Sequence, residues 1–166
     1  MSLRPKDPDS PAPKGSGREK YGAISLPDHS NMAGWMERMD VVARYNLAAD
    51  EKDVEGTLSH YTKDGVIEGF YSTGEGREAM RRDLPALFEG EGTLKRHLAP
   101  NLVIDGDGES ARVRYVLLVV EGEERPMVGA TARITDEMRK VEGRWLISRH
   151  LIEIDPSIRV YQQETG

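Results

Sequence analysis

The stretch TLKRHLAPNLVI, residues 93–104, is where the spacing of apolar side chains changes along this chain. Upstream of it, apolar residues recur every three or four positions, as on one face of a helix, and from it onward they alternate, as on one face of a strand. Three more alternating segments follow at about 110–121, 126–140 and 144–155, separated by the turn sequences DGDGE, GEER and VEGR. Because connections this short join antiparallel neighbours, we predict a four-stranded antiparallel meander.

The segment before residue 93 is expected to hold three helices and one strand. In the first helix, which Ser30 or Asn31 caps, the apolar residues that recur at helical spacing are Trp35, Met36, Met39, Val42, Ala43 and Leu47. Asp53 is expected to cap a short second helix that TKDG (62–65) ends, and a strand VIEGFY (66–71) follows. The third helix runs from about Arg77 to Glu89, with a kink or break at Pro85. This order predicts an α+β domain in which a curved sheet wraps around helices.

Length and composition favour one folded domain with extensions. Five of the nine prolines lie in residues 1–27, among Lys, Asp, Ser and Gly, and such a segment cannot bury enough apolar surface to offset its ordering entropy. We therefore expect an extension over residues 1–30 that is disordered alone or lies along the domain or a neighbouring subunit. The domain itself is expected over residues 31–156, followed by a tail over 157–166.

Composition also excludes several functions. The chain has no cysteine and a net charge of −6, so thiolate chemistry is excluded and binding to nucleic acid is not expected. Its longest apolar run, YVLLVV (115–120), is far too short for a membrane span, and the N-terminus lacks the apolar core of a secretory signal. We expect a cytoplasmic protein that holds no metal, because its four histidines are scattered outside any metal-binding motif.

The histidine at position 97 is the first candidate for chemistry. Alternation places it on one face with Ala99, Asn101 and Val103, and we expect this face to line a cavity. An imidazole, with an ordinary pKa of about 6.5, takes and gives protons near neutral pH. The alternative is a hydrogen-bonded structural histidine.

The element order, the helix-to-strand junction YTKDGVIE (61–68) and the last strand VEGRWLISR (141–149) resemble the SnoaL-like proteins of the nuclear transport factor 2-like superfamily. The resemblance covers about residues 32–155. It implies a cone of bent sheet and three helices, an apolar pocket for a small-molecule substrate, and a homodimer. It also implies chemistry without a cofactor, as in the cyclases, isomerases and dehydratases of the superfamily.

The resemblance assigns roles to two residues. His97 matches a strand histidine that acts as general base in dehydratases of the superfamily, where a first-helix carboxylate holds it. Here that part of the helix reads Arg44, Tyr45, Asn46 and Leu47, and the flanking acids Asp40 and Asp50 are expected to face outward. Tyr45 matches the oxyanion-binding tyrosine of ketosteroid isomerase; the alternative is an aromatic residue at the rim.

Other residues are weaker candidates. The base of ketosteroid isomerase falls at Gly69, next to Glu68, and its second oxyanion donor falls at Asp136, which we expect at a solvated strand end. In the last strand, Trp145, Ile147 and Arg149 are expected on one face, and Ser148, His150 and Ile152 on the other. We predict a catalytic pair of His97 and Tyr45, with the substrate bound by Trp35, Asn101, Arg149 and Glu68.

Three functions remain open at this point. The first is a cofactor-free enzyme that cyclises, isomerises or dehydrates a largely apolar, oxygenated molecule of polyketide or terpenoid type. The second is a non-catalytic member of the fold that binds an apolar ligand or serves as an oligomerisation module. The third is the small subunit of a ring-hydroxylating dioxygenase, which needs a large partner subunit.

Overall fold

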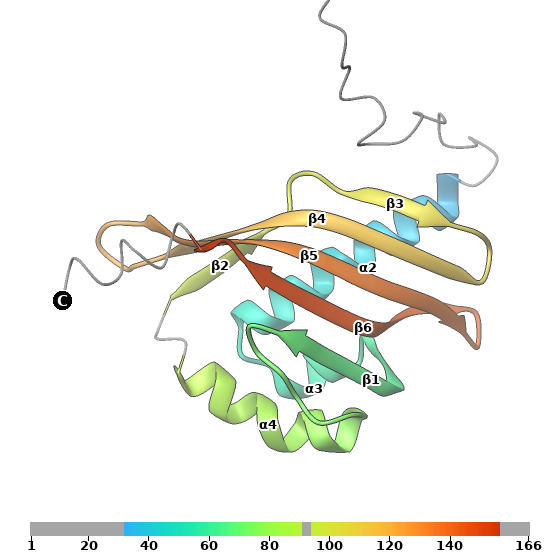
Figure 1. Cartoon of the computed structure of the whole chain (residues 1–166), viewed down its shortest axis with the longest axis horizontal. Coiled ribbons are helices and arrows are strands. Elements are labelled where there is room, and N and C mark those ends of the chain that lie inside the picture. The colour runs from blue at the N-terminus through green and yellow to red at the C-terminus, as the bar shows by residue number, and fades with distance from the viewer. Residues whose placement is uncertain (1–31, 91–93, 157–166) are drawn as a thin grey trace, which may run out of the picture. The chain divides into compact units, whose positions relative to one another are not determined.

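The computed structural model describes residues 32–90 and 94–156 (Figure 1). The expected extension over residues 1–30, the capping residues Ser30 and Asn31, and the tail over 157–166 lie outside the described residues. The described residues from Ala33 on belong to one compact unit.

Three helices precede or interrupt the sheet in the described part of the chain: α2 (Met32–Asp50), α3 (Val54–Leu58) and α4 (Arg77–Gly90). Asp53 caps α3, since its carboxylate accepts a hydrogen bond of 2.9 Å from the backbone N–H of Gly56. Helix α4 continues through Pro85, so the expected break is absent there. Arg77, at the start of α4, donates through Nε to the carbonyl of Tyr61 at 2.9 Å and so ties this helix to the first strand.

The sheet is curved, open and mixed. Its six strands are β1 (Tyr61–Gly69), β2 (Lys95–Leu98), β3 (Val103–Gly106), β4 (Ser110–Glu121), β5 (Met127–Val141) and β6 (Arg144–Ile154). Their order is β1-β6-β5-β4-β2, with β3 also paired to β4. Only the β1–β6 pair is parallel among them. Figure 1 shows α2 crossing one face of this sheet while α4 lies beside β1.

Two strand boundaries differ from the sequence-based expectation. The segment TKDG (62–65) belongs to β1. The expected strand over 93–104 is two short strands, because Pro100 lies between them and cannot donate to a ladder. In that gap the side chain of Asn101 accepts a hydrogen bond of 3.1 Å from the N–H of Val116. Val103 is consequently exposed, while Leu102 and Ile104 pack against the core.

The face of α2 that packs on the sheet is rotated from the expected one. Met36 and Leu47 are 61% and 59% exposed, whereas Val42 and Tyr45 are buried with Arg38 and Asn46. Apolar residues lie around much of this helix, so their spacing alone does not define the buried face. Arg38 defines it better: its guanidinium lies 4.6 Å from the centre of the Trp145 ring, and its Nε donates to the carbonyl of Gly34 at 2.8 Å.

A bulge in β6 changes which of its residues face inward. Met138 of β5 pairs with Ile147 and Glu137 pairs with Arg149, so Ser148 is the additional residue. Ile147 and His150 are therefore both buried, although strict alternation assigns them to opposite faces. Arg149 remains on the outer side.

Gly69 ends β1 with a backbone conformation that residues other than glycine rarely adopt. Its φ is +106°, and a Cβ atom there would lie 2.0 Å from the carbonyl oxygen of Ile152. A residue with a catalytic carboxylate does not fit at this position without a shift of the β1–β6 backbone. Position 69, which matches the base of ketosteroid isomerase, therefore cannot hold a catalytic carboxylate in this backbone.

We predict that Gly69→Ala lowers the free energy of unfolding by about 1–3 kcal/mol, through strain at positive φ and the clash with Ile152. Urea denaturation followed by circular dichroism measures this change. Gly108→Ala is the matched control, because nothing lies within 4 Å of a Cβ atom there. Equal stability of the two variants would contradict the prediction.

Candidate functional site

His97 lies on the inner face of the sheet, in the short strand β2. It pairs with Val119 of β4, whose side chain is buried in the core, and residues opposite each other in an antiparallel pair point to the same face. His97 therefore faces inward, but the face expected to line a cavity does so only in part. His97 and Ala99 line a pocket, whereas Asn101 and Val103 on the same expected face are exposed. Its side chain is 14% exposed.

Asp50, the last residue of α2, is the partner of His97. Its Oδ1 lies 2.6 Å from Nδ1 of the ring, and the backbone N–H of His97 donates to Oδ1 at 3.1 Å and to Oδ2 at 3.3 Å. The expectation that Asp50 faces outward is wrong, since its side chain is only 6% exposed. The chain turns from α2 toward α3 at this point, and the carboxylate is left facing β2.

This arrangement favours a defined role for each ring nitrogen. A carboxylate at the C-terminal end of a helix is disfavoured by the helix dipole, so the hydrogen bonds from His97 compensate for its position. An ionised carboxylate only accepts hydrogen bonds, which makes Nδ1 the protonated nitrogen in the neutral ring. Nε2 then carries the lone pair and is the atom that can take a proton.

A pocket of about 330 Å³ adjoins the histidine between α2 and the β2–β3 segment. Its lining is mainly apolar and consists of Met39, Val42, Ala43, Asn46, Leu47, His97, Leu98, Ala99 and Leu102. The volume is at the lower end of the range for small-molecule sites. The pocket is partly open to solvent, since Leu47 and Leu98 in its lining are exposed, and its apolar wall lowers the local dielectric around the few polar groups in it.

A second histidine–carboxylate pair lies deeper, on the sheet itself. His150 of β6 stands opposite Asp136 of β5, and Nδ1 of the ring is 2.5 Å from Oδ1 of the carboxylate. Asp136 is 0% exposed and His150 is 3% exposed. The expectation of a solvated strand end at Asp136 is therefore wrong, because the hairpin extends five residues beyond it, to Val141.

Three tyrosines surround this inner pair. The Tyr45 ring lies 5.0 Å from the His150 ring and 5.6 Å from the Tyr61 ring, measured between centres. Burial and then the neighbouring Tyr45 raise the pKa of the Tyr61 hydroxyl well above its ordinary value. Burial and then the charge of Asp136 do the same to the pKa of Tyr115. Both tyrosines are therefore neutral at physiological pH.

Tyr45 is thus a core residue, and the rim position considered for it is wrong. It is absent from the lining of the His97 pocket, whereas the next residue, Asn46, is part of that lining. The structure consequently brings together His97, Asp50 and Asn46, and places Tyr45 in the inner cluster with His150. His97 and Tyr45 were expected to face each other across one cavity, but only His97 lines this pocket.

The four residues expected to bind substrate lie outside the lining of this pocket. Arg149 forms an ion pair with Glu68 on the outer side of the sheet, with 2.7 Å between Nη2 and Oε2. Glu68 holds the pKa of the Arg149 guanidinium above its ordinary value through their hydrogen bond. Asn101 is exposed, and Trp35 is half-buried near the start of α2. Their role in binding substrate stays a prediction, and none of the four lines this pocket.

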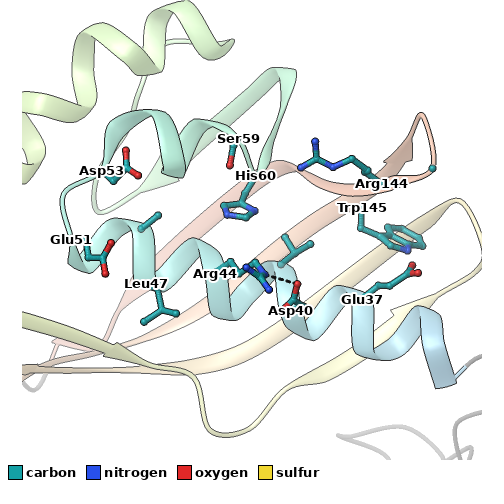
Figure 2. A pocket seen from close by; sticks show the side chains of 13 residues that line it. Glu37, Asp40, Arg44, Leu47, Glu51, Asp53, Ser59, His60, Arg144 and Trp145 are labelled. Carbon is teal, nitrogen blue, oxygen red and sulfur yellow. Dashed lines mark hydrogen bonds and ion pairs between the residues drawn. The ribbon is translucent and has the colours of Figure 1, made fainter.

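A larger groove of about 750 Å³ runs along the other side of α2 (Figure 2). Figure 2 shows its side chains arriving from α2, from the α3–β1 junction at His60 and from the β5–β6 hairpin at Arg144. Burial, together with the charges of Arg144 and Arg44, lowers the pKa of His60. Arg44 is paired with Asp40 at 2.7 Å, so this groove combines charges of both signs without a buried histidine–carboxylate pair.

Sequence reasoning considered Asp50 and Asn46 without placing either beside His97, and it did not predict that Asp136 pairs with His150. A usable signal exists for the first two: residues 46 and 50 are four apart, so a helix places them on one face. The Asp136–His150 pair gave no such signal, because it depends on the bulge at Ser148.

Within the described ranges, no group of three or more His, Asp or Glu side chains is arranged to hold a metal ion. The same part of the chain contains no helix that is long and apolar enough to span a membrane.

Comparison with known proteins gives one family match and many structural matches. A family model described as a SnoaL-like domain matches residues 39–150. A protein of unknown function with a cystatin-like fold from Nostoc punctiforme is 30% identical, with a TM-score of 0.72, and the match covers 78% of this chain and 96% of that chain. These two findings confirm the expected fold and the resemblance.

Two further solved structures are similar. A protein from Catenulispora acidiphila, solved in complex with S-DNPA, is 26% identical over 77% of this chain and 98% of its own, with a TM-score of 0.67. A proposed scytalone dehydratase from Novosphingobium aromaticivorans is 19% identical over 76% and 87%, with a TM-score of 0.65, which shows the fold alone. The comparison with curated proteins finds no match.

We predict that neutral His97 and His150 both carry their proton on Nδ1, because each Nδ1 faces a carboxylate oxygen. Long-range ¹H–¹⁵N correlation spectra distinguish the two tautomers. Asp50→Ala should shift His97 toward the Nε2-protonated form that free histidine prefers and leave His150 unchanged. A spectrum with Nε2-protonated His97 in the wild type would contradict the geometry.

We also predict a loss of stability above about pH 10 that comes from Tyr61 and Tyr115. Their folded-state pKa values are raised, so the unfolded chain loses these protons first and stability falls as the pH rises through the unfolded value. Each group contributes at most about 1.4 kcal/mol per pH unit. Urea titrations at pH 8 to 11 should show a shallower fall for the double variant Y61F/Y115F, and parallel curves would contradict this.

Proposed function

Because the chain belongs to the SnoaL-like domain family, whose model matches residues 39–150, we propose that it is a cofactor-free enzyme. Its reaction moves a proton on a small, largely apolar, oxygenated molecule, and His97 acts as both general base and general acid. The observation that carries this proposal is the Asp50–His97 pair, 2.6 Å apart, at the wall of an apolar pocket.

The roles follow from the positions of the two ring nitrogens. Nε2 removes a proton from a carbon or oxygen of the bound molecule, and Asp50 stabilises the imidazolium that forms because it faces Nδ1. The same imidazolium then returns the proton to another atom. The overall reaction is an isomerisation if the acceptor atom is a second carbon, and a dehydration if it is a departing hydroxyl.

The geometry favours neutral molecules as substrates. The pocket lining contains neither Lys nor Arg, and the acidic Asp50 lies behind His97. A carboxylate or phosphate would lose hydration there without gaining a cationic partner. Neutral ketones, enols and alcohols of polyketide or terpenoid type fit this environment.

A non-catalytic protein that binds an apolar ligand is the second candidate. The absence of Tyr45 from the pocket lining favours it, since the enzyme proposal then lacks the hydrogen-bond donor expected from that residue. Exchange of a carbon-bound proton separates the two candidates, because it needs a base and not merely a cavity.

Two proposals concern partners. We propose that the chain forms a homodimer through the outer face of the sheet, where Val116 is exposed. Ion pairs such as Arg114–Asp105, at 2.7 Å, lie on the same face. A role as small subunit of a ring-hydroxylating dioxygenase stays a prediction, which co-purification with an iron-bearing large subunit would test.

We predict that the wild type accelerates hydrogen–deuterium exchange next to the carbonyl of 2-tetralone in D₂O, measured by NMR. His97→Gln should lower the rate constant kcat/KM by about 10²–10⁴, the usual contribution of a general base. Asp50→Asn should lower it by about tenfold or more, because the ring loses its orientation and its countercharge.

The matched control is His60→Gln, which changes a histidine of the larger groove and should leave the exchange rate unchanged. Unchanged exchange in His97→Gln would contradict the enzyme proposal. Saturable binding of 2-tetralone without accelerated exchange would instead support the non-catalytic candidate.

A further inference from the structure

Asn46 is a buried polar residue to which the proposed reaction gives no role. It is 6% exposed and lies on the inner face of α2, four residues before Asp50. It lines the same pocket as His97 and is the one amide among the lining residues of that pocket. On its inner side the amide interacts with the hydroxyl of Tyr115, whose pKa it lowers, and an amide has a second N–H donor that can face the pocket.

The groups behind Asn46 are polar and partly unsatisfied. Among the described residues, the Tyr115 hydroxyl and Oδ2 of Asp136 are buried and lack a hydrogen-bond partner of normal geometry. The amide of Asn46 lies close enough to lower the pKa of Tyr115, against the larger raising effects of burial and of Asp136. A polar path therefore leads from the pocket wall at Asn46 to the Asp136–His150 pair.

The amide suits this place better than an acid would. A carboxylate at position 46 would add a negative charge one helical turn from Asp50, inside a region that already holds Asp136. A neutral amide avoids this repulsion and offers two N–H donors and one acceptor. It can donate to an oxygen atom in the pocket without competing with His97 for a proton.

We infer that Asn46 is the specificity-determining residue of the His97 pocket, and that its side-chain amide binds a carbonyl or hydroxyl oxygen of a neutral ligand. The inference rests on the pocket named in the proposed function and deepens it, because it defines the ligand as an oxygenated compound held by a neutral donor. The bound oxygen is also where negative charge develops when His97 removes an adjacent proton, so the same hydrogen bond strengthens during the reaction.

The test measures binding alone, with 2-tetralone and its deoxygenated counterpart tetralin. Calorimetric titration of the wild type should show a preference of about tenfold or more for 2-tetralone, consistent with one buried hydrogen bond. Asn46→Leu should bind 2-tetralone and tetralin with about equal affinity, and its affinity for tetralin should match that of the wild type. If Asn46→Leu does not fold, Asn46→Ala gives the same comparison, because the ratio of affinities is internal to each variant.

The control is Glu153→Gln, which introduces an amide at an exposed position of β6 outside the pocket lining and should leave the preference unchanged. Equal affinity of the wild type for both probes, or an undiminished preference in Asn46→Leu, would overturn the inference. His97→Gln should keep the preference for 2-tetralone and lose the exchange reaction. A preserved preference without exchange in the wild type would therefore overturn the enzyme proposal and leave the role of Asn46 supported.

Discussion

The fit of helix α2 on the sheet depends on polar groups that this helix must bury. Arg38 stacks on Trp145 near the start of the helix, and Asp50 accepts hydrogen bonds from His97 at its end. Each contact joins α2 to a different part of the sheet, so together they define both the rotation and the position of the helix. An apolar stripe alone permits small rotations, whereas a buried charge without its partner is costly.

The two histidine–carboxylate pairs have the same side-chain chemistry but differ in their access to a ligand. Asp136 and His150 lie side by side on neighbouring strands and are buried, with the ring of Tyr45 beside that of His150. The pair of Asp50 and His97 joins a helix end to a short strand and adjoins a pocket. Only the latter has ready access to a ligand, which is why the proposed chemistry is assigned to it. The inner pair is suited to holding the core in one arrangement around the neutral tyrosines.

Much of the fold could be predicted from local patterns. The change of period near residue 93 identified the meander, and the cap at Asp53 identified α3, because both signals depend on neighbours in the chain. The errors occurred where a single residue interrupts a pattern. Pro100 divides one expected strand into two, and the additional residue Ser148 changes the faces of β6. Such interruptions are decided by pairing across strands, which local periodicity does not contain.

The sequence by itself determined the α+β class, the order of the elements and the inward position of His97, since alternation and helical spacing are properties of short segments. Only the tertiary structure decided which carboxylate meets that histidine. Asp50 is 47 residues away from it, and whether it faces solvent or β2 depends on how α2 ends against the sheet. The stretch at 93–104 carries the imidazole, but its partner and the amide of Asn46 come to the same pocket through the packing of a distant helix.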